Sequence, residues 1–332
     1  MELPHHCSDS LFVITNDVGS RISGLRSLGL KTPAADDFIF RKFHENLAER
    51  ISRMLPEVKV VTYDMNELVR NIWAQALKLK ADLSSAVVVS TCAELAETRR
   101  GHIVEMNRIV DVEGSIIGFG PRPGAPLIGD QIAGIAEIAR GKSVVVAEDG
   151  AFSGKTINYL VSRLAKHRIE VAGLVVGICF PKAVESIRRS FNGKFIVVEE
   201  TEKPFEWMPD HDFLPFVPNC GRVFGTMFGN EGMPCYTHDG VSFSFPYILP
   251  FGDPVNWASI PQEHAVDFSL FCLRESLALF RILDEMNGRP LKIRDIMRST
   301  PRVSMPMTRG RRHLPNAGIS ISGFLSEVCH EF

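Results

Sequence analysis

Two adjacent acids and a Gly-Lys-Thr sequence follow one apolar run near the middle of the chain. The stretch VVVAEDGAFSGKT covers residues 144–156, and its two acids are Glu148 and Asp149. The apolar run is typical of a buried strand, and the residues after Thr156 have helical periodicity. A turn between these elements can aim backbone N–H groups at a phosphate, while the carboxylates can bind hydroxyl groups or magnesium. The stretch therefore predicts a phosphate site beside a site for hydroxyl groups.

A nucleoside triphosphate loop is the first alternative for these residues. Such a loop needs a longer spacing before its Gly-Lys-Ser/Thr ending, and Gly150 is one residue too close to Gly154. Asp149 stands where the first glycine of that loop would be, and two carboxylates there would repel a triphosphate. A sugar with a diol and a single phosphate suits the same residues, because Ser153 and Thr156 add hydroxyl donors. We therefore expect a ribose 5-phosphate.

Short apolar runs alternate with helix-length amphipathic stretches over much of the chain. The predicted strands are 11–15, 58–62, 86–90, 103–109, 115–119, 144–147, 171–178 and 195–198. The predicted helices are 37–55, 66–80, 128–139, 156–166, 183–190 and 264–286. Because parallel strands are joined by crossover helices, the alternation predicts an α/β fold with a mostly parallel sheet flanked by helices.

Residues 144–156 resemble the fingerprint of the type I phosphoribosyltransferases, in which apolar residues precede two acids, a short spacer and Ser/Thr-Gly-Gly/Lys-Ser/Thr. The resemblance implies that Glu148 and Asp149 lie near the ribose hydroxyl groups of phosphoribosyl pyrophosphate and bind Mg²⁺. It implies that the turn binds the 5-phosphate through Gly150, Ala151, Phe152, Ser153, Gly154, Lys155 and Thr156. Glycine at position 154 would let the backbone approach the ligand closely. The implied activity is transfer of the ribose 5-phosphate to an acceptor.

The same resemblance implies a pyrophosphate-binding loop after an earlier strand. The run 86–90 is the best match, and it leads into Ser90, Thr91 and Cys92. The candidate catalytic cations for the departing pyrophosphate are Arg99, Arg100, Arg122 and Lys182. Arg122 stands in Gly-Pro-Arg-Pro-Gly, where relatives have a mobile loop, but a rigid turn with an exposed arginine is an open alternative. Arg108 either reaches the substrate or is an exposed strand residue.

An aromatic and proline-rich stretch after Glu200 occupies the place of the hood that covers the acceptor in many relatives. Trp207 and Phe213 are the candidate stacking faces, together with Phe216, and Asp212 or Asp210 is the candidate for an amine or magnesium. Ordinary core packing is the alternative. Phe152 replaces an acid that hypoxanthine-guanine relatives carry, so the small-molecule acceptor stays open. A nucleotide-sensing regulator or partner-bound effector with little or no transferase activity is the alternative function.

The predicted organisation has an N-terminal addition at 1–80, the core at 81–200, the hood at 201–255, and a C-terminal helix with a basic tail at 256–332. The 37 basic and 39 acidic residues nearly cancel, so the overall charge gives no reason to expect a polyanionic partner. The basic tail leaves open a protein partner or a nucleic-acid partner. A homodimer is also left open. Seven cysteines without a CxxC pair fit reduced thiols. With no signal peptide or spanning apolar run, we expect a cytoplasmic protein without a membrane partner.

Overall fold

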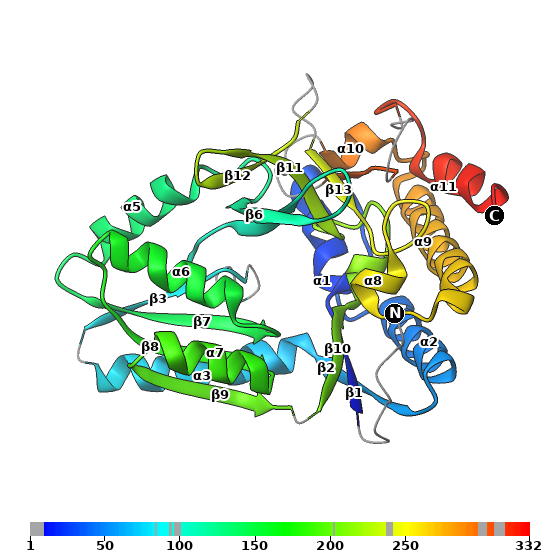
Figure 1. Ribbon diagram of the computed structural model, residues 1–332. Coiled ribbons are helices and arrows are strands. Elements are labelled where there is room, and N and C mark those ends of the chain that lie inside the picture. The colour runs from blue at the N-terminus through cyan, green and yellow to red at the C-terminus, as the bar shows by residue number, and fades with distance from the viewer. Residues whose placement is uncertain are drawn as a thin grey trace.

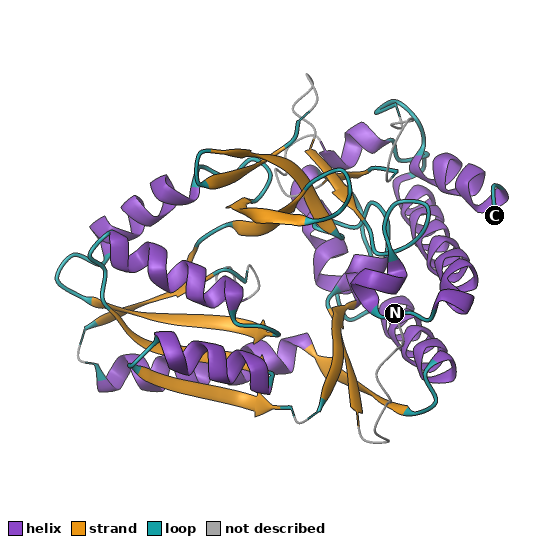
Figure 2. Ribbon diagram, in the orientation of Figure 1, coloured by secondary structure: helices purple, strands orange, loops and turns teal. Residues whose placement is uncertain are grey.

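The computed structural model describes residues 10–83, 85–92, 95, 101–201, 203–236, 242–297, 304–308 and 316–332. Its strands form three sheets. One sheet and its helices lie at one end of the molecule, and the long helices α2 and α9 lie at the other end (Figures 1 and 2). The two remaining sheets lie between these ends.

The first sheet contains only parallel pairs. Its strands are β3 (Ala86–Ser90), β4 (His102–Ile103), β7 (Ser143–Ala151), β8 (Val171–Cys179) and β9 (Lys194–Glu200), in the order β4-β3-β7-β8-β9. Valine-rich strands that are buried on both faces are typical of a parallel sheet covered by helices. The carboxyl ends of β3 and β7 lie side by side, which is where open α/β sheets bind their ligands.

Helices cover both faces of this sheet (Figure 1). One face packs against α3 (Met65–Asp82), and the other packs against α5 (Ile128–Ile138), α6 (Lys155–Lys166) and α7 (Pro181–Ser190). Because successive strand residues point to opposite faces, Val145 belongs to the core under α3, whereas Val146 belongs to the core under the other three helices. This double layer fixes the position of the strand ends.

The second sheet is a parallel set of three strands in the order β10-β1-β2. Its strands are β1 (Ser10–Asn16), β2 (Val58–Asp64) and β10 (Pro204–Pro209), and β10 leads into the 3-10 helix η2 (Asp210–Phe213). The helices outside the first sheet's two layers are α1 (Val18–Ser23), α2 (Phe38–Met54), α8 (Pro254–Ala258), α9 (Ala265–Asn287), α10 (Ile293–Met297) and α11 (Ile321–His330), with η1 (Gly24–Leu28) and η3 (Gln262–His264). Their apolar residues form one aromatic-rich core.

The third sheet is mixed and has the order β14-β13-β11-β5-β6, with β12 also paired to β11. Its strands are β5 (Met106–Val110), β6 (Ile116–Pro121), β11 (Arg222–Phe228), β12 (Glu231–Pro234), β13 (Ser242–Phe245) and β14 (Ser304–Pro306). The pairing of β5 with β11 is parallel and joins segments that are far apart in sequence. It therefore brings the predicted core and the predicted hood into direct contact.

The α/β prediction is confirmed, with parallel sheets flanked by helices. Two details differ from the expectation. The strands belong to three sheets, and the strand expected at 103–109 is divided between β4 and β5, because β4 pairs with β3 whereas β5 pairs with β6 and β11. The boundaries proposed at 80, 200 and 255 stay predictions. None of the helices in the described ranges has the length and apolar character that a membrane span requires.

Candidate functional site

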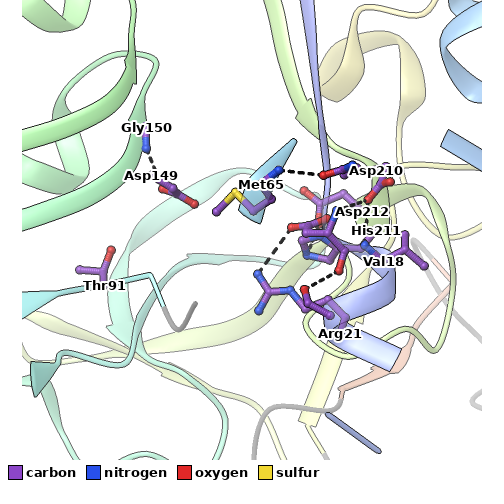
Figure 3. Close-up of polar contacts among 12 residues, drawn as sticks. Val18, Arg21, Met65, Thr91, Asp149, Gly150, Asp210, His211 and Asp212 are labelled. Atoms are coloured by element: carbon purple, nitrogen blue, oxygen red, sulfur yellow. Dashed lines mark hydrogen bonds and ion pairs between the residues drawn. The ribbon is translucent and has the colours of Figure 1, made fainter. Parts of the chain in front are cut away.

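A cavity of about 450 Å³ is lined by residues from all three sheets. Figure 3 shows Thr91, Asp149 and Gly150 on one side, and Arg21, His211 and Asp212 on the opposite side. The predicted site residues that line this cavity are Thr91, Arg122, Glu148, Asp149, Gly150, Phe152, Thr156, Trp207 and Asp212. The fold therefore gathers residues from the predicted pyrophosphate loop, fingerprint and hood around one space.

The two acids lie at the end of β7, beside the end of β3. Glu148 is buried, and the Thr91 hydroxyl group donates to its carboxylate with oxygen–oxygen distances of 2.7 and 2.6 Å. The backbone N–H of Thr91 donates to Glu148 Oε2 at 3.3 Å. Asp149 is partly exposed, and its Oδ1 accepts from the N–H of Gly150 at 2.8 Å. Asp149 is thus the acid that a ligand in the cavity reaches more easily.

Burial and the neighbouring charge of Asp149 raise the pKa of Glu148 to about 8. The hydrogen bonds from Thr91 and the charge of Arg122 lower this pKa, but they do not offset the burial. Glu148 is therefore mostly protonated at neutral pH in the ligand-free protein. A cation bound beside it would favour the charged form, so the protonation of Glu148 is coupled to occupation of the cavity.

Arg122 approaches this pair from the end of β6. Its Nη2 donates to the backbone carbonyl of Thr91 at 2.7 Å, and its backbone N–H donates to the backbone carbonyl of Glu105 at 2.9 Å. The side chain therefore lies beside the loop that was predicted to bind pyrophosphate. In this structure Arg122 is held by hydrogen bonds at both its backbone and its side chain, so the expected mobility of its loop stays a prediction.

The turn after the acids is shaped by two glycines. Gly154 has a φ of +72°, which favours glycine, and α6 begins directly after it at Lys155. A Cβ at position 154 would lie 3.2 Å from Ile187 Cγ1 of α7, so a larger residue there would crowd α7. A Cβ on Gly150 would lie 2.4 Å from Trp207 Cη2. The indole of Trp207 therefore packs directly on the fingerprint turn.

Several predicted residues do not line the cavity: Ser90, Cys92, Ala151, Ser153, Gly154, Lys155, Lys182 and Phe213. Phe213 and Phe216 were expected as stacking faces, but both are fully buried in the aromatic core, because the hood folds onto α9 and α11. Asp210 is also buried, and it accepts hydrogen bonds from the N–H groups of Asp17 and Val18 at the start of α1. Arg99, Arg100 and the arginines at 309, 311 and 312 lie outside the described residues.

A buried histidine and its acidic partner form a part of the site that the sequence analysis missed. His211 Nδ1 lies 2.7 Å from Asp17 Oδ1, and its Nε2 lies 3.4 Å from Asp212 Oδ1. Burial lowers the pKa of His211, but the charges of Asp17 and Asp212 outweigh this effect and raise it to about 9. His211 is therefore a cation at neutral pH. The sequence Asp-His-Asp at 210–212 was the available signal, but its partner Asp17 is far away in the chain.

The hood also contributes an arginine that the sequence analysis did not single out. The Arg222 guanidinium lies 4.5 Å from the ring centroid of Trp257 and 5.3 Å from that of Tyr247. All three residues line the cavity. Arg222 is the first residue of β11, and its aromatic neighbours come from segments further along the chain. No spacing within the sequence predicts this arrangement.

The residues at the end of β7 fit a magnesium ion. Mg²⁺ is usually bound through one or two carboxylates together with the phosphates of a substrate. Asp149 offers a partly exposed carboxylate on the cavity wall, and Glu148 lies next to it. Glu148 is less available, since both of its oxygens accept hydrogen bonds from Thr91. Asp149 is therefore the principal candidate ligand.

No protein-family model and no curated protein matches the chain. Among solved structures, the chain is similar to a protein from Thermus thermophilus at 15% identity, covering 41% of this chain and 84% of that chain, with a TM-score of 0.27. It is similar to a hypothetical protein from Neisseria gonorrhoeae with bound ppGpp at 16% identity, 44% and 84% coverage, and a TM-score of 0.31. A purine phosphoribosyltransferase from Pyrococcus horikoshii is similar at 18% identity, 42% and 85% coverage, and a TM-score of 0.29. At such low TM-scores, these likenesses support no inference about function.

Proposed function

We propose that the protein is a phosphoribosyltransferase-like enzyme that binds phosphoribosyl pyrophosphate with Mg²⁺ and transfers its ribose 5-phosphate to a small-molecule acceptor. One observation carries this proposal: Asp149 and Glu148 of the fingerprint line the same cavity as Thr91 and Arg122. The carboxylates and the arginine are the groups that a ribose diol and a pyrophosphate need, respectively. The geometry supports the proposal because strand ends far apart in sequence bring these groups together.

In the proposed reaction, the bond between the anomeric carbon and pyrophosphate breaks, and an acceptor atom bonds to that carbon. Asp149 orients the ribose hydroxyl groups, and the 5-phosphate is held at the part of the turn that lines the cavity, which is formed by Gly150, Phe152 and Thr156. Arg122 stabilises the negative charge that develops on the departing pyrophosphate. Mg²⁺, when bound at Asp149, neutralises part of the same charge.

The acceptor would enter from the wall formed by β10, η2 and β11. Trp207 on this wall packs against Gly150, so the acceptor side and the ribose side of the cavity are adjacent. Phe152 also lines the cavity, in the place where hypoxanthine-guanine relatives carry an acid. The cavity therefore lacks that proton acceptor at position 152, which disfavours a purine held in the same manner.

Calorimetry and a product assay test the proposal in sequence. Phosphoribosyl pyrophosphate is titrated into the protein with and without Mg²⁺, and pyrophosphate release is then measured with a panel of nucleobases, amines and water. We expect saturable, Mg²⁺-dependent binding and release of pyrophosphate with at least one acceptor. Saturable binding without release in any mixture would instead favour the nucleotide-sensing regulator. Absence of binding would contradict both functions.

Replacement of Arg122 tests its assigned role. Arg122→Ala should lower kcat by roughly 30- to 800-fold, because losing one contact to a developing anion costs about 2 to 4 kcal/mol in the transition state. The affinity for ribose 5-phosphate should change little. Steady-state kinetics and calorimetry measure the two effects, with Arg140→Ala as the control, since Arg140 is exposed and does not line the cavity. A normal kcat in Arg122→Ala would remove Arg122 from the reaction.

A further inference from the structure

Two arginines occupy neighbouring positions on the hood side of the cavity. In the parallel pair of β5 and β11, Val223 is opposite Ile109. When this register is continued by one residue, Arg222 lies opposite Arg108, and side chains in directly opposite positions point to the same face of a sheet. Both arginines line the cavity. The fold thus brings two positively charged residues to one wall of the cavity, although they come from segments far apart in the chain.

Arg222 is held in a fixed position by aromatic side chains. Its guanidinium lies 4.5 Å from the Trp257 ring centroid and 5.3 Å from the Tyr247 ring centroid. Its Nε donates to the Tyr247 hydroxyl at 3.3 Å, and its Nη1 donates to the Gly114 carbonyl at 3.4 Å. These contacts leave donors of the planar guanidinium for another group, and they reduce the entropy that binding would otherwise cost.

The described carboxylates do not neutralise this pair directly. Neither Arg108 nor Arg222 forms an ion pair with an acid in the described part of the chain. Glu206 lies close enough to interact with both charges, but its Oε2 accepts from Ser259 Oγ at 2.8 Å and its Oε1 accepts from the Trp207 N–H at 3.1 Å. Burial also raises the pKa of Glu206, and the charges of Arg222 and Arg108 act in the opposite direction. The two arginines therefore share one nearby acid, Glu206, whose two oxygens already accept other hydrogen bonds.

We propose that Arg108 and Arg222 form an anion-binding subsite that receives a carboxylate or phosphate group of the acceptor. Adjacent like charges on neighbouring strands repel each other, and an anion bound between them removes that repulsion. The guanidinium fork matches the oxygens of both anionic groups. This inference rests on the proposed function, since it names the acceptor of the same reaction: a small acidic molecule, whose anionic group is held away from the turn at 150–156.

Calorimetry with two aromatic anions and a neutral analogue tests the subsite. Benzoate, phenyl phosphate and benzamide are each titrated into the full chain at fixed ionic strength. Benzoate is the main probe because it carries no phosphate that could occupy the turn at 150–156. We expect benzoate to bind more tightly than benzamide. If benzoate binds more tightly than phenyl phosphate, the acceptor carries a carboxylate group. If phenyl phosphate binds more tightly, and still does so when ribose 5-phosphate saturates the protein, the acceptor carries a phosphate group.

Two substitutions connect this binding to the arginines. Arg108→Gln and Arg222→Gln should each weaken benzoate binding by about tenfold or more, since each removes a charge-assisted contact. The Arg108 side chain is exposed and forms no hydrogen bond to another described residue, so Arg108→Gln tests the subsite even if Arg222→Gln disturbs the packing of Trp257. Arg41→Gln is the matched control, because Arg41 is an exposed residue of α2 outside the cavity.

The outcomes separate this inference from the proposed function. Phosphoribosyl pyrophosphate is titrated into the same variants. If phosphoribosyl pyrophosphate binds the wild type, but benzoate binding is absent or is equal in all variants, the assignment of the anion subsite is wrong. The proposed function is then unaffected. If phosphoribosyl pyrophosphate does not bind, but benzoate binding depends on Arg108 and Arg222, the arginines bind an anion and the proposed transferase function fails.

Discussion

At the scale of single residues, Glu148 combines burial, a hydrogen bond from Thr91 and an adjacent charge on Asp149. Its pKa of about 8 in the folded protein lies above that of an unfolded chain, so the folded state binds the proton more tightly. The bound proton therefore contributes its full stabilisation of the folded state below the pKa of the unfolded chain. This contribution is lost as the pH rises toward 8. Near neutral and higher pH, burial of the Glu148 carboxyl group therefore costs free energy of folding. Such a cost is typical of a residue that serves binding rather than stability.

The variant Glu148→Gln should remove this pH dependence, because its neutral amide cannot ionise. Relative to wild type, its free energy of unfolding should rise between pH 5 and pH 8 by on the order of 3 to 4 kcal/mol. Urea denaturation in EDTA without ligand measures the difference. Glu137→Gln, at an exposed position of α5, is the control and should show no such trend. Parallel pH profiles for Glu148→Gln and wild type would show that Glu148 is charged in the folded protein.

Unlike the buried Glu148 carboxyl group, the buried ion pair of Asp17 and His211 stabilises the folded protein near neutral pH. Burial raises the pKa of Asp17, but His211 outweighs this and holds the pKa well below its usual range. Asp17→Asn should therefore lower the free energy of unfolding by about 3 kcal/mol near pH 6, because it removes the closer of the two carboxylates that face a buried cation. The loss should shrink as the pH rises toward 9, where His211 releases its proton.

Denaturation of Asp17→Asn at pH 6 and pH 9 measures this effect. Asp82→Asn is the matched control, since Asp82 forms an exposed ion pair with Lys194 at 2.9 Å. Exposed pairs of this kind contribute roughly 0 to 1 kcal/mol. An equal loss for Asp17→Asn and Asp82→Asn at pH 6 would mean that the buried pair does not stabilise the fold.

At the scale of elements, the strand, turn and helix at 143–166 depend on the conformation of Gly154. Gly154→Ala should cost about 1 to 2 kcal/mol of stability, because the residue has a positive φ and its Cβ would crowd α7. Gly134→Ala is the control, since Gly134 lies in α5 with open space around it and should gain roughly 0.5 to 1 kcal/mol. Thermal unfolding separates the two results, and equal effects would contradict the strained turn.

The elements of the parallel sheet could be predicted from the sequence because their signals are local. The valine runs of β3 and β7 and the periodicity of α6 each lie within one short segment. The hood could not be predicted in the same way. Phe213 and Trp207 are both aromatic residues of the predicted hood. Only the packing of α9 decides that Phe213 enters the core while Trp207 lines the cavity.

At the scale of the whole molecule, the cavity exists because three sheets converge on the ends of β3 and β7. The acids and Thr91 come from the first sheet, Trp207 comes from the second, and Arg108 and Arg222 come from the third. The pairs Asp17 with His211 and Arg108 with Arg222 bring together residues from opposite parts of the chain. Sequence patterns can predict each strand, but they do not predict which distant strands become neighbours.

The affinities of wild type and Asp149→Asn for phosphoribosyl pyrophosphate test whether the acids at the end of β7 bind this ligand. Isothermal titration calorimetry at fixed Mg²⁺ measures the affinity, and thermal unfolding verifies that the variant is folded. Asp36→Asn, an exposed site outside the cavity, is the control. We expect wild type and Asp36→Asn to bind alike, and Asp149→Asn to bind about tenfold or more weakly, because it loses a charge that holds the ribose and Mg²⁺. Unchanged affinity in folded Asp149→Asn, or no binding by wild type, would contradict the account.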